Sequence, residues 1–167
     1  MARSFKDKDR DTLLVARRRA MGGLAFFRHM LDGQMPQAPM TRLLKMRLLE
    51  VGEGRVVFGA KPSRAHYNGM GVVHGGFAAT LLDSALGCAI NTMAPPGKIY
   101  TTLELKINFI RPALPSLFTA EAWLIHLGSR TAVGEAEIMN EEGKLIAKCL
   151  SSLVIIPDEP APAGSGD

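Results

Sequence analysis

The segment from Phe77 to Asn91 constrains the fold most strongly, because its residues are apolar on nearly every face of the helix that their spacing predicts. A helix that is apolar all round must be surrounded by protein rather than lie on a surface. It follows the sequence His74-Gly75-Gly76 and contains one acidic residue, Asp83. The rest of the chain therefore has to build a layer of structure around this helix.

Alternating apolar and polar residues predict strands on both sides of that helix. After Pro95-Pro96-Gly97 the pattern changes to a period of two in four segments, which are residues 100–109, 117–127, 131–139 and 144–156. Upstream, residues 46–50 and 55–60 flank the turn Gly52-Glu53-Gly54 and form a predicted hairpin. Two strands, one buried helix and four more antiparallel strands predict an α+β fold in which a sheet wraps a central helix.

The remaining residues leave little room for a second domain. The 167 residues, of which 47% are hydrophobic, fit one globular core. Residues 1–40 are predicted to be a basic N-terminal helical arm and linker, with a helix over residues 12–31 that is kinked at Gly22-Gly23. Residues 41–157 form the main domain. Residues 158–167 are rich in Pro, Ala and Gly and are expected to be a disordered tail.

The positive charge is concentrated in the N-terminal arm. Residues 1–30 hold eight Lys or Arg against three Asp, a net charge of +5, whereas the whole chain carries +4, so residues 31–167 carry about −1. The triplet Arg17-Arg18-Arg19 could meet nucleic acid, a membrane surface or the phosphates of a ligand, but a solvated helix face is the simpler interpretation. We therefore expect no nucleic-acid partner.

The sequence also favours a cytoplasmic protein without a metal ion. Cys88 and Cys149 lie far apart, with neither CxxC nor Cys/His ligand spacing, so we expect no metal, no cofactor and no disulfide. No apolar run reaches the roughly 18 residues that a membrane span needs. The acidic residues Asp7, Asp9 and Asp11 do not fit the basic start of a signal peptide.

The glycine pair at the start of the buried helix is a candidate oxyanion site. The backbone amides of a first helical turn lack partners within the helix, and the absence of side chains on Gly75 and Gly76 lets a carbonyl approach them. The helix dipole favours negative charge on that oxygen. Alternatively, the glycines merely permit a sharp turn. His74 could be a catalytic base, but we favour a structural donor that fixes the loop.

Asp83 is the second candidate for chemistry. Burying an ionised aspartate in an apolar helix without partners costs several kcal/mol, so something must compensate for it. It is either a hydrogen-bonded structural acid or a nucleophile or general base whose pKa the apolar setting tunes. Asn68 is either a turn residue or a donor to a ligand. Thr102, on a predicted strand, is by default an ordinary strand threonine.

Together, residues 68–156 resemble the PaaI-like acyl-CoA thioesterases of the hotdog superfamily. The resemblance rests on residues 68–76 (NGMGVVHGG), 79–85 (ATLLDSA) and 101–112 (TTLELKINFIRP), and on the turn Gly128-Ser129-Arg130. It implies a hotdog fold and the hydrolysis of an acyl-CoA thioester to a free acid and CoA. The basic arm lies outside the resemblance.

The resemblance implies a role for each matching position. The Gly75 amide would polarise the thioester carbonyl, and Asp83 would attack it or activate water across a dimer interface. Asn68 would hold the carbonyl or the attacking group, and Thr102 would orient water or the carboxylate. The remaining expected substrate contacts are His74, Gly76, Gly128 and Arg130, the last to a phosphate of CoA.

The family pairs its sheets edge to edge, so we expect a homo-oligomer, either a dimer or a dimer of dimers that forms a homotetramer. A hotdog hydratase is disfavoured, because residues 64–69 lack a GDxNPxH-like sequence. The alternative from another class is a non-catalytic acyl-CoA-binding regulator whose basic arm binds nucleic acid. Asp83 argues against it, because binding alone does not require a buried acid. Aryl, short and medium acyl groups remain open.

Overall fold

One antiparallel sheet forms the body of the protein. The structure is a computed structural model that describes residues 5–158, with side chains described from residue 12 onward. Within these residues six strands pair in the order β1-β2-β4-β5-β6-β3. Their bounds are β1 (Met46–Gly52), β2 (Arg55–Ala60), β3 (Lys98–Phe109), β4 (Phe118–Leu127), β5 (Thr131–Asn140) and β6 (Leu145–Pro157). The hairpin and the four later strands are confirmed, each end within two residues of its predicted position.

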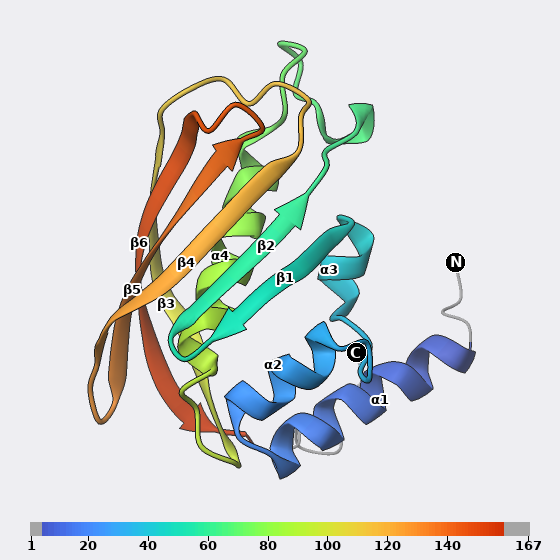
Figure 1. Ribbon diagram of the computed structural model, residues 1–167, viewed down its shortest axis with the longest axis vertical. Helices are drawn as coiled ribbons and strands as arrows, with labels where there is room; N and C mark the ends of the chain where they lie inside the picture. The colour runs from blue at the N-terminus through green and yellow to red at the C-terminus, as the bar shows by residue number, and fades with distance from the viewer. Residues whose placement is uncertain (1–4, 159–167) are drawn as a thin grey trace, which may run out of the picture.

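The long helix α4 (Gly75–Asn91) runs along this curved sheet (Figure 1). Its sheet-facing side is buried and consists of Phe77, Ala78, Leu81, Leu82, Ala85, Leu86, Ala89 and Ile90. The opposite stripe, which includes Asp83 and Gly87, is only half-buried. The expectation that protein surrounds this helix is therefore only partly right: the small and polar residues of one stripe remain accessible. The sheet and helix form the predicted hotdog arrangement.

The N-terminal arm is divided into more helices than the periodicity predicts. It contains α1 (Phe5–Ala20), α2 (Gly23–Leu31) and the short α3 (Pro39–Leu43), and a single 3₁₀ turn, η1 (Arg64–His66), follows the first hairpin. The expected kinked helix is thus two helices that separate before Gly23. A Cβ atom on Gly23 would lie 1.6 Å from the carbonyl oxygen of Asn91. Only glycine lets the start of α2 approach the end of α4 so closely.

The arm is part of the hydrophobic core. α2 packs beside β1 and α4, and its residues Phe26, Phe27 and Met30 are buried there. Figure 1 shows α1 lying alongside α2 at the same end of the molecule. Residues 12–31 therefore pack against the sheet and α4.

The predicted tail begins with a residue that is fixed. Asp158 is 8% exposed, and its Oδ1 accepts hydrogen bonds from Arg18 and, at 3.2 Å, from Arg19. The assignment of Asp158 to a disordered tail is therefore corrected, because two guanidinium groups of α1 hold it. Residues 159–167 lie outside the described part of the chain.

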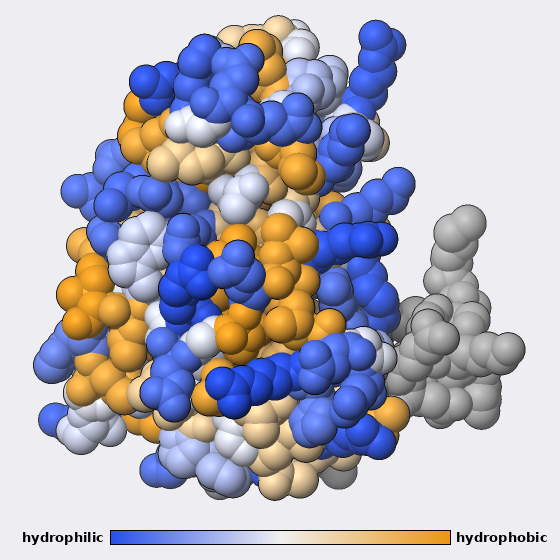
Figure 2. Space-filling view, viewed as in Figure 1, coloured by the Kyte–Doolittle hydropathy of each residue, from blue (hydrophilic) through white to orange (hydrophobic). Residues whose placement is uncertain are grey.

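The described surface is mixed in polarity. Figure 2 shows hydrophobic surface in the middle of the face on which β1 and α3 lie. The exposed large hydrophobic residues of these two elements are Met40, Leu43 and Leu49. Within residues 5–158, no helix has both the length and the apolar character that crossing a bilayer requires.

Candidate active site

Asp83 and Thr102 meet on the accessible side of α4. Asp83 belongs to the half-buried stripe of the helix, and Thr102 lies on β3, which packs beside it. The Thr102 hydroxyl donates a 2.9 Å hydrogen bond to Asp83 Oδ1. Among residues 5–158 this is the one hydrogen bond of that carboxylate, so Oδ2 remains available to another group. The pair combines an ionisable oxygen with a hydroxyl that fixes its orientation.

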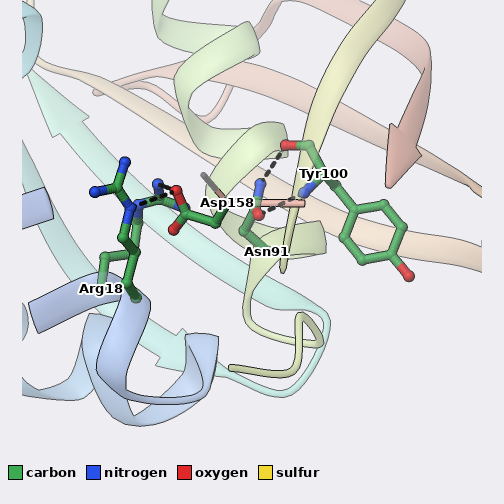
Figure 3. Close-up of polar contacts among 5 residues, drawn as sticks. Arg18, Asn91, Tyr100 and Asp158 are labelled. Carbon is green, nitrogen blue, oxygen red and sulfur yellow. Dashed lines mark hydrogen bonds and ion pairs between the residues drawn. The ribbon is translucent and has the colours of Figure 1, made fainter. Parts of the chain in front are cut away.

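Asn91 fixes the position of β3 relative to α4. Its side-chain amide donates to the carbonyl oxygen of Gly87 at 2.8 Å. The same amide donates to the Tyr100 carbonyl, and its Oδ1 accepts from the Tyr100 amide, both at 2.8 Å (Figure 3). The side chain thus pairs with both backbone groups of Tyr100, as a neighbouring strand would. Tyr100 lies two residues before Thr102, and Asn91 two turns after Asp83. This contact therefore holds the two elements that carry the Asp83–Thr102 pair.

The start of α4 offers a backbone amide. His74 is the N-cap, and its Nδ1 accepts a 2.8 Å hydrogen bond from the Gly76 amide. A Cβ atom on Gly76 would lie 2.9 Å from Nδ1, so a side chain there would displace the imidazole. The Gly75 amide donates no hydrogen bond to any residue that the structure describes. It is therefore free to bind a carbonyl oxygen.

Asn68 closes the loop that precedes α4. Its Oδ1 accepts hydrogen bonds from the amides of Met70, at 2.9 Å, and Val72, at 3.3 Å. The His74 amide donates to the His66 carbonyl at 2.8 Å, which ties the end of the loop to its beginning. The oxygen of Asn68 is thus used within the loop, while its side-chain NH₂ has no partner among the described residues.

The turn Gly128-Ser129-Arg130 lies near the first half of β3. Gly128 donates to the Thr131 carbonyl at 2.8 Å, and Ile155 of β6 donates to the Arg130 carbonyl at 2.9 Å. Thr131 and Thr101 pair with opposite sides of Val154, so the turn is two strands, roughly 10 Å, from Thr101. The Arg130 side chain is exposed.

The candidate residues form two groups within one chain. Asp83 and Thr102 are in contact, whereas Gly75 stands eight residues before Asp83 on the same helix. A helix rises 1.5 Å per residue, so the Gly75 amide and the Asp83 backbone are separated by about 12 Å along the axis. An amide and a carboxylate that act on one carbonyl must each lie about 3 Å from it. A single chain therefore does not bring the two groups together on one carbonyl.

A cavity of about 370 Å³ opens beside Asp83 and Thr102. Its walls come mainly from β3, from the accessible stripe of α4 and from the N-terminal helices α1 and α2, and Thr41 of α3 and Phe58 of β2 also line it. The sequence patterns did not predict this contribution of the arm. The hydrophobic periodicity of residues 12–31 was the available signal, but it does not identify the surface against which the arm packs.

The cysteine in this cavity is not a candidate nucleophile. Burial, together with the negative charge of Asp83, raises the pKa of the Cys88 thiol to about 12. The thiol therefore stays protonated at neutral pH, and a protonated thiol is a weak nucleophile and metal ligand. Between residues 12 and 158, no three His, Cys, Asp or Glu side chains gather as a metal site would require.

Comparison with known proteins identifies the family of the chain. Residues 70–147 match the family model of the thioesterase superfamily. A protein of Saccharolobus solfataricus that is named provisionally as an esterase is 31% identical over 115 residues, which are 69% of this chain and 81% of the relative. The medium/long-chain acyl-CoA thioesterase YigI of Escherichia coli is 27% identical over 132 residues, covering 70% of this chain and 85% of the relative.

A solved structure supports the fold. The PaaI protein of the Escherichia coli phenylacetic acid degradation operon superposes with a TM-score of 0.70 at 22% identity, over 87% of this chain and 96% of that one. Its likeness concerns the fold, and the family assignment rests on the sequence matches. The chain belongs to the thioesterase superfamily, has the hotdog fold of its PaaI-like members and is a thioester hydrolase.

Proposed function

We propose that this protein hydrolyses acyl-CoA thioesters to the free acid and CoA, and that Asp83 is its reacting carboxylate. The observation that carries the proposal is the 2.9 Å hydrogen bond from Thr102 to Asp83 at the mouth of a cavity. The bond engages one carboxylate oxygen and leaves the other open to a substrate or a water molecule. The name of the YigI relative supports an acyl-CoA as the substrate.

In the proposed reaction, Asp83 either attacks the thioester carbon or takes a proton from a water molecule that attacks it. A carbon–oxygen bond forms, the carbon–sulfur bond breaks, and CoA leaves as a thiolate that takes up a proton. When water attacks, this step gives the free acid directly; when Asp83 attacks, it gives a mixed anhydride with Asp83, which a water molecule then hydrolyses to the free acid and the regenerated carboxylate. The Gly75 amide stabilises the negative charge on the carbonyl oxygen in the transition state, and the start of α4 adds its dipole. Asn68, through its free NH₂ group, holds the carbonyl or the attacking group.

The active unit in this proposal contains two copies of the chain. The separation of about 12 Å between Gly75 and Asp83 means that one carbonyl reaches Asp83 of one copy and Gly75 of another. β3 is an edge strand, with Leu103 62% exposed and Phe109 57% exposed, and pairing it with a second β3 would cover both residues. A dimer of dimers would preserve the same shared sites.

Substitution of Asp83 tests the chemistry. Asp83→Asn keeps the shape of the side chain but removes its charge, so kcat/KM for acyl-CoA should fall at least about a hundredfold, the lower range for loss of a general base. The assay should use a panel of acyl-CoA thioesters with aryl, short and medium acyl groups. Glu53→Gln, in the exposed β1–β2 turn, removes one carboxylate elsewhere and should keep wild-type activity. Wild-type rates in Asp83→Asn would rule out the role given to Asp83.

Complementation tests the shared site. Gly75→Pro removes one backbone N–H at the first helical position, which accommodates proline. His74, with ψ of 135°, already has the conformation that a following proline favours. Gly75→Ala is the matched control, because any Cβ there approaches the Phe109 ring to 3.2 Å. When inactive Asp83→Asn and Gly75→Pro chains are mixed and re-paired, half the dimers carry one intact site, so about a quarter of wild-type activity should return. An inactive mixture would place each site within one chain.

A further inference from the structure

We propose, building on the function proposed above, that the cavity beside Asp83 binds the acyl chain of the substrate, and that the N-terminal helices make it selective for an acyl chain of medium length. The cavity begins at the Asp83–Thr102 pair and continues along α4 towards Asn91. A thioester whose carbonyl reaches Asp83 can therefore place its acyl chain in the same space.

The wall of the cavity that the N-terminal arm provides suits a hydrocarbon chain. On the side of the arm, the lining residues include Leu14 and Val15 of α1 and Phe26, Phe27 and Met30 of α2. These side chains are apolar and carry no charge, so burying methylene groups against them removes apolar surface from water without stranding a polar group. The arm thus has the composition of a binding wall as well as of a core element.

Gly87 leaves space in the opposite wall of the cavity, which α4 forms. It lies one turn after Asp83 on the same stripe of α4 and lines the cavity. A Cβ atom built on Gly87 would meet no atom within 4 Å. A glycine in the interior of a helix lowers helix stability, and here no close neighbour requires it. The missing side chain leaves room for a ligand beside the carboxylate.

The length of the accessible stripe of α4 from Asp83 to Asn91 sets the length of the acyl chain that the cavity accommodates. Asp83 and Asn91 are eight residues apart, which corresponds to about 12 Å along the helix. An extended covalent chain advances roughly 1.2 Å per bond, as a polypeptide does when its three bonds per residue span about 3.6 Å. The cavity therefore accommodates roughly ten bonds. At its far end, Asn91 is fixed by Tyr100, and Arg18 of α1 is held by Asp158 (Figure 3).

The test compares wild type, Gly87→Ala and Gly87→Leu on saturated acyl-CoA thioesters of about two to about sixteen carbons. Each methylene that enters the cavity should raise wild-type kcat/KM by up to about fourfold, until the rise stops near ten carbons. Gly87→Leu should shorten the preferred chain by several carbons, and so lower kcat/KM for the longest accepted chains far more than for the shortest ones, whereas Gly87→Ala should have a smaller effect. Gly87→Ala should melt at or above the wild-type temperature, because it replaces a helical glycine and its Cβ atom would meet no atom within 4 Å.

A second variant tests the wall that the arm provides. Val15 is 38% exposed, so Val15→Phe adds volume without disturbing a tightly packed site. It should lower kcat/KM for the longest accepted chains by at least about tenfold, because an added ring excludes several methylene groups. Gly87→Leu and Val15→Phe proteins that keep the wild-type length profile would refute the pocket while leaving the role of Asp83 intact. A wild type that hydrolyses no acyl-CoA would instead overturn the proposed function and the pocket with it.

Discussion

Replacing Asn91 by alanine should loosen the junction between α4 and β3. The substitution removes three hydrogen bonds of 2.8 Å, two of them to the backbone of Tyr100. The third goes to the Gly87 carbonyl, which also has its helical partner, so its loss should cost little. A typical intramolecular hydrogen bond contributes about 1 kcal/mol net, and the two bonds to Tyr100 therefore account for about 2 kcal/mol of the free energy of unfolding.

This loss converts into a measurable change in melting temperature. In a domain of this size, 1 kcal/mol corresponds to roughly 2–4 °C, so Asn91→Ala should melt about 4–8 °C below wild type. Its kcat/KM should also fall by up to about tenfold, because Thr102 lies two residues beyond the freed Tyr100 and loses part of its alignment with Asp83. Calorimetry at a fixed protein concentration and a thioesterase assay give the two readings.

A second substitution and a control variant distinguish the loss of the Asn91 hydrogen bonds from a general effect of surface mutation. Asn91→Asp keeps the acceptor for the Tyr100 amide but turns a carboxylate oxygen towards carbonyl groups, so it should destabilise at least as much as Asn91→Ala. Asn108→Ala changes an exposed asparagine of the same strand that makes no side-chain hydrogen bond among the described residues. If Asn91→Ala and Asn108→Ala melt at the same temperature, the Asn91 side chain does not hold the two elements together.

Four further outcomes are expected. Asp158→Asn should lower kcat/KM for long acyl chains more than for short ones, since it weakens the hold on α1, and an unchanged ratio would contradict this. Gly23→Ala should lower the melting temperature by several degrees in a circular dichroism scan, because its Cβ atom would lie 1.6 Å from a carbonyl oxygen of α4. A melting temperature equal to that of wild type would mean that the start of α2 moves away from α4 without loss of stability. Burial raises the pKa of the Cys149 thiol to about 11 and that of the Cys88 thiol to about 12, above the ordinary 9.0. The folded protein therefore keeps protons that the unfolded chain releases, so the free energy of unfolding, measured with urea, should fall between pH 9 and pH 11. A free energy of unfolding that does not change over this range would count against both shifts. Arg130→Gln should raise KM for acyl-CoA severalfold without lowering kcat, and an unchanged KM at low salt would remove Arg130 from the CoA site.

The elements of the sheet and the central helix could be predicted because each is long and strongly periodic. The alternation in residues 100–109 and the apolar run of residues 77–91 are local signals that tertiary packing reinforces. The contact between Thr102 and Asp83 is different, because no periodicity indicates which strand residue faces which turn of α4. That pairing was implied by the family resemblance alone.

The arm shows what local patterns miss. Gly22-Gly23 indicated a weak point in one helix, whereas the reason for Gly23 is its approach to the end of α4, a contact between segments far apart in sequence. The acyl cavity has the same origin, since its walls come from elements that are far apart in the sequence. Composition also assigned Asp158 to a flexible tail, although two arginines of α1 hold it.

The contact between Arg18 and Asp158 joins residues 140 positions apart. Closing so long a loop has a high entropic cost, and the contact gains stability only after the sheet has brought β6 next to the arm. On a ribosome, α1 emerges before the sheet, and Arg18 meets Asp158 only after almost the whole described chain has followed. The sheet and α4 can therefore fold before the contact between Arg18 and Asp158 holds the arm in place. Removing the residues that follow β6, Asp158 among them, would alter the cavity wall that α1 forms.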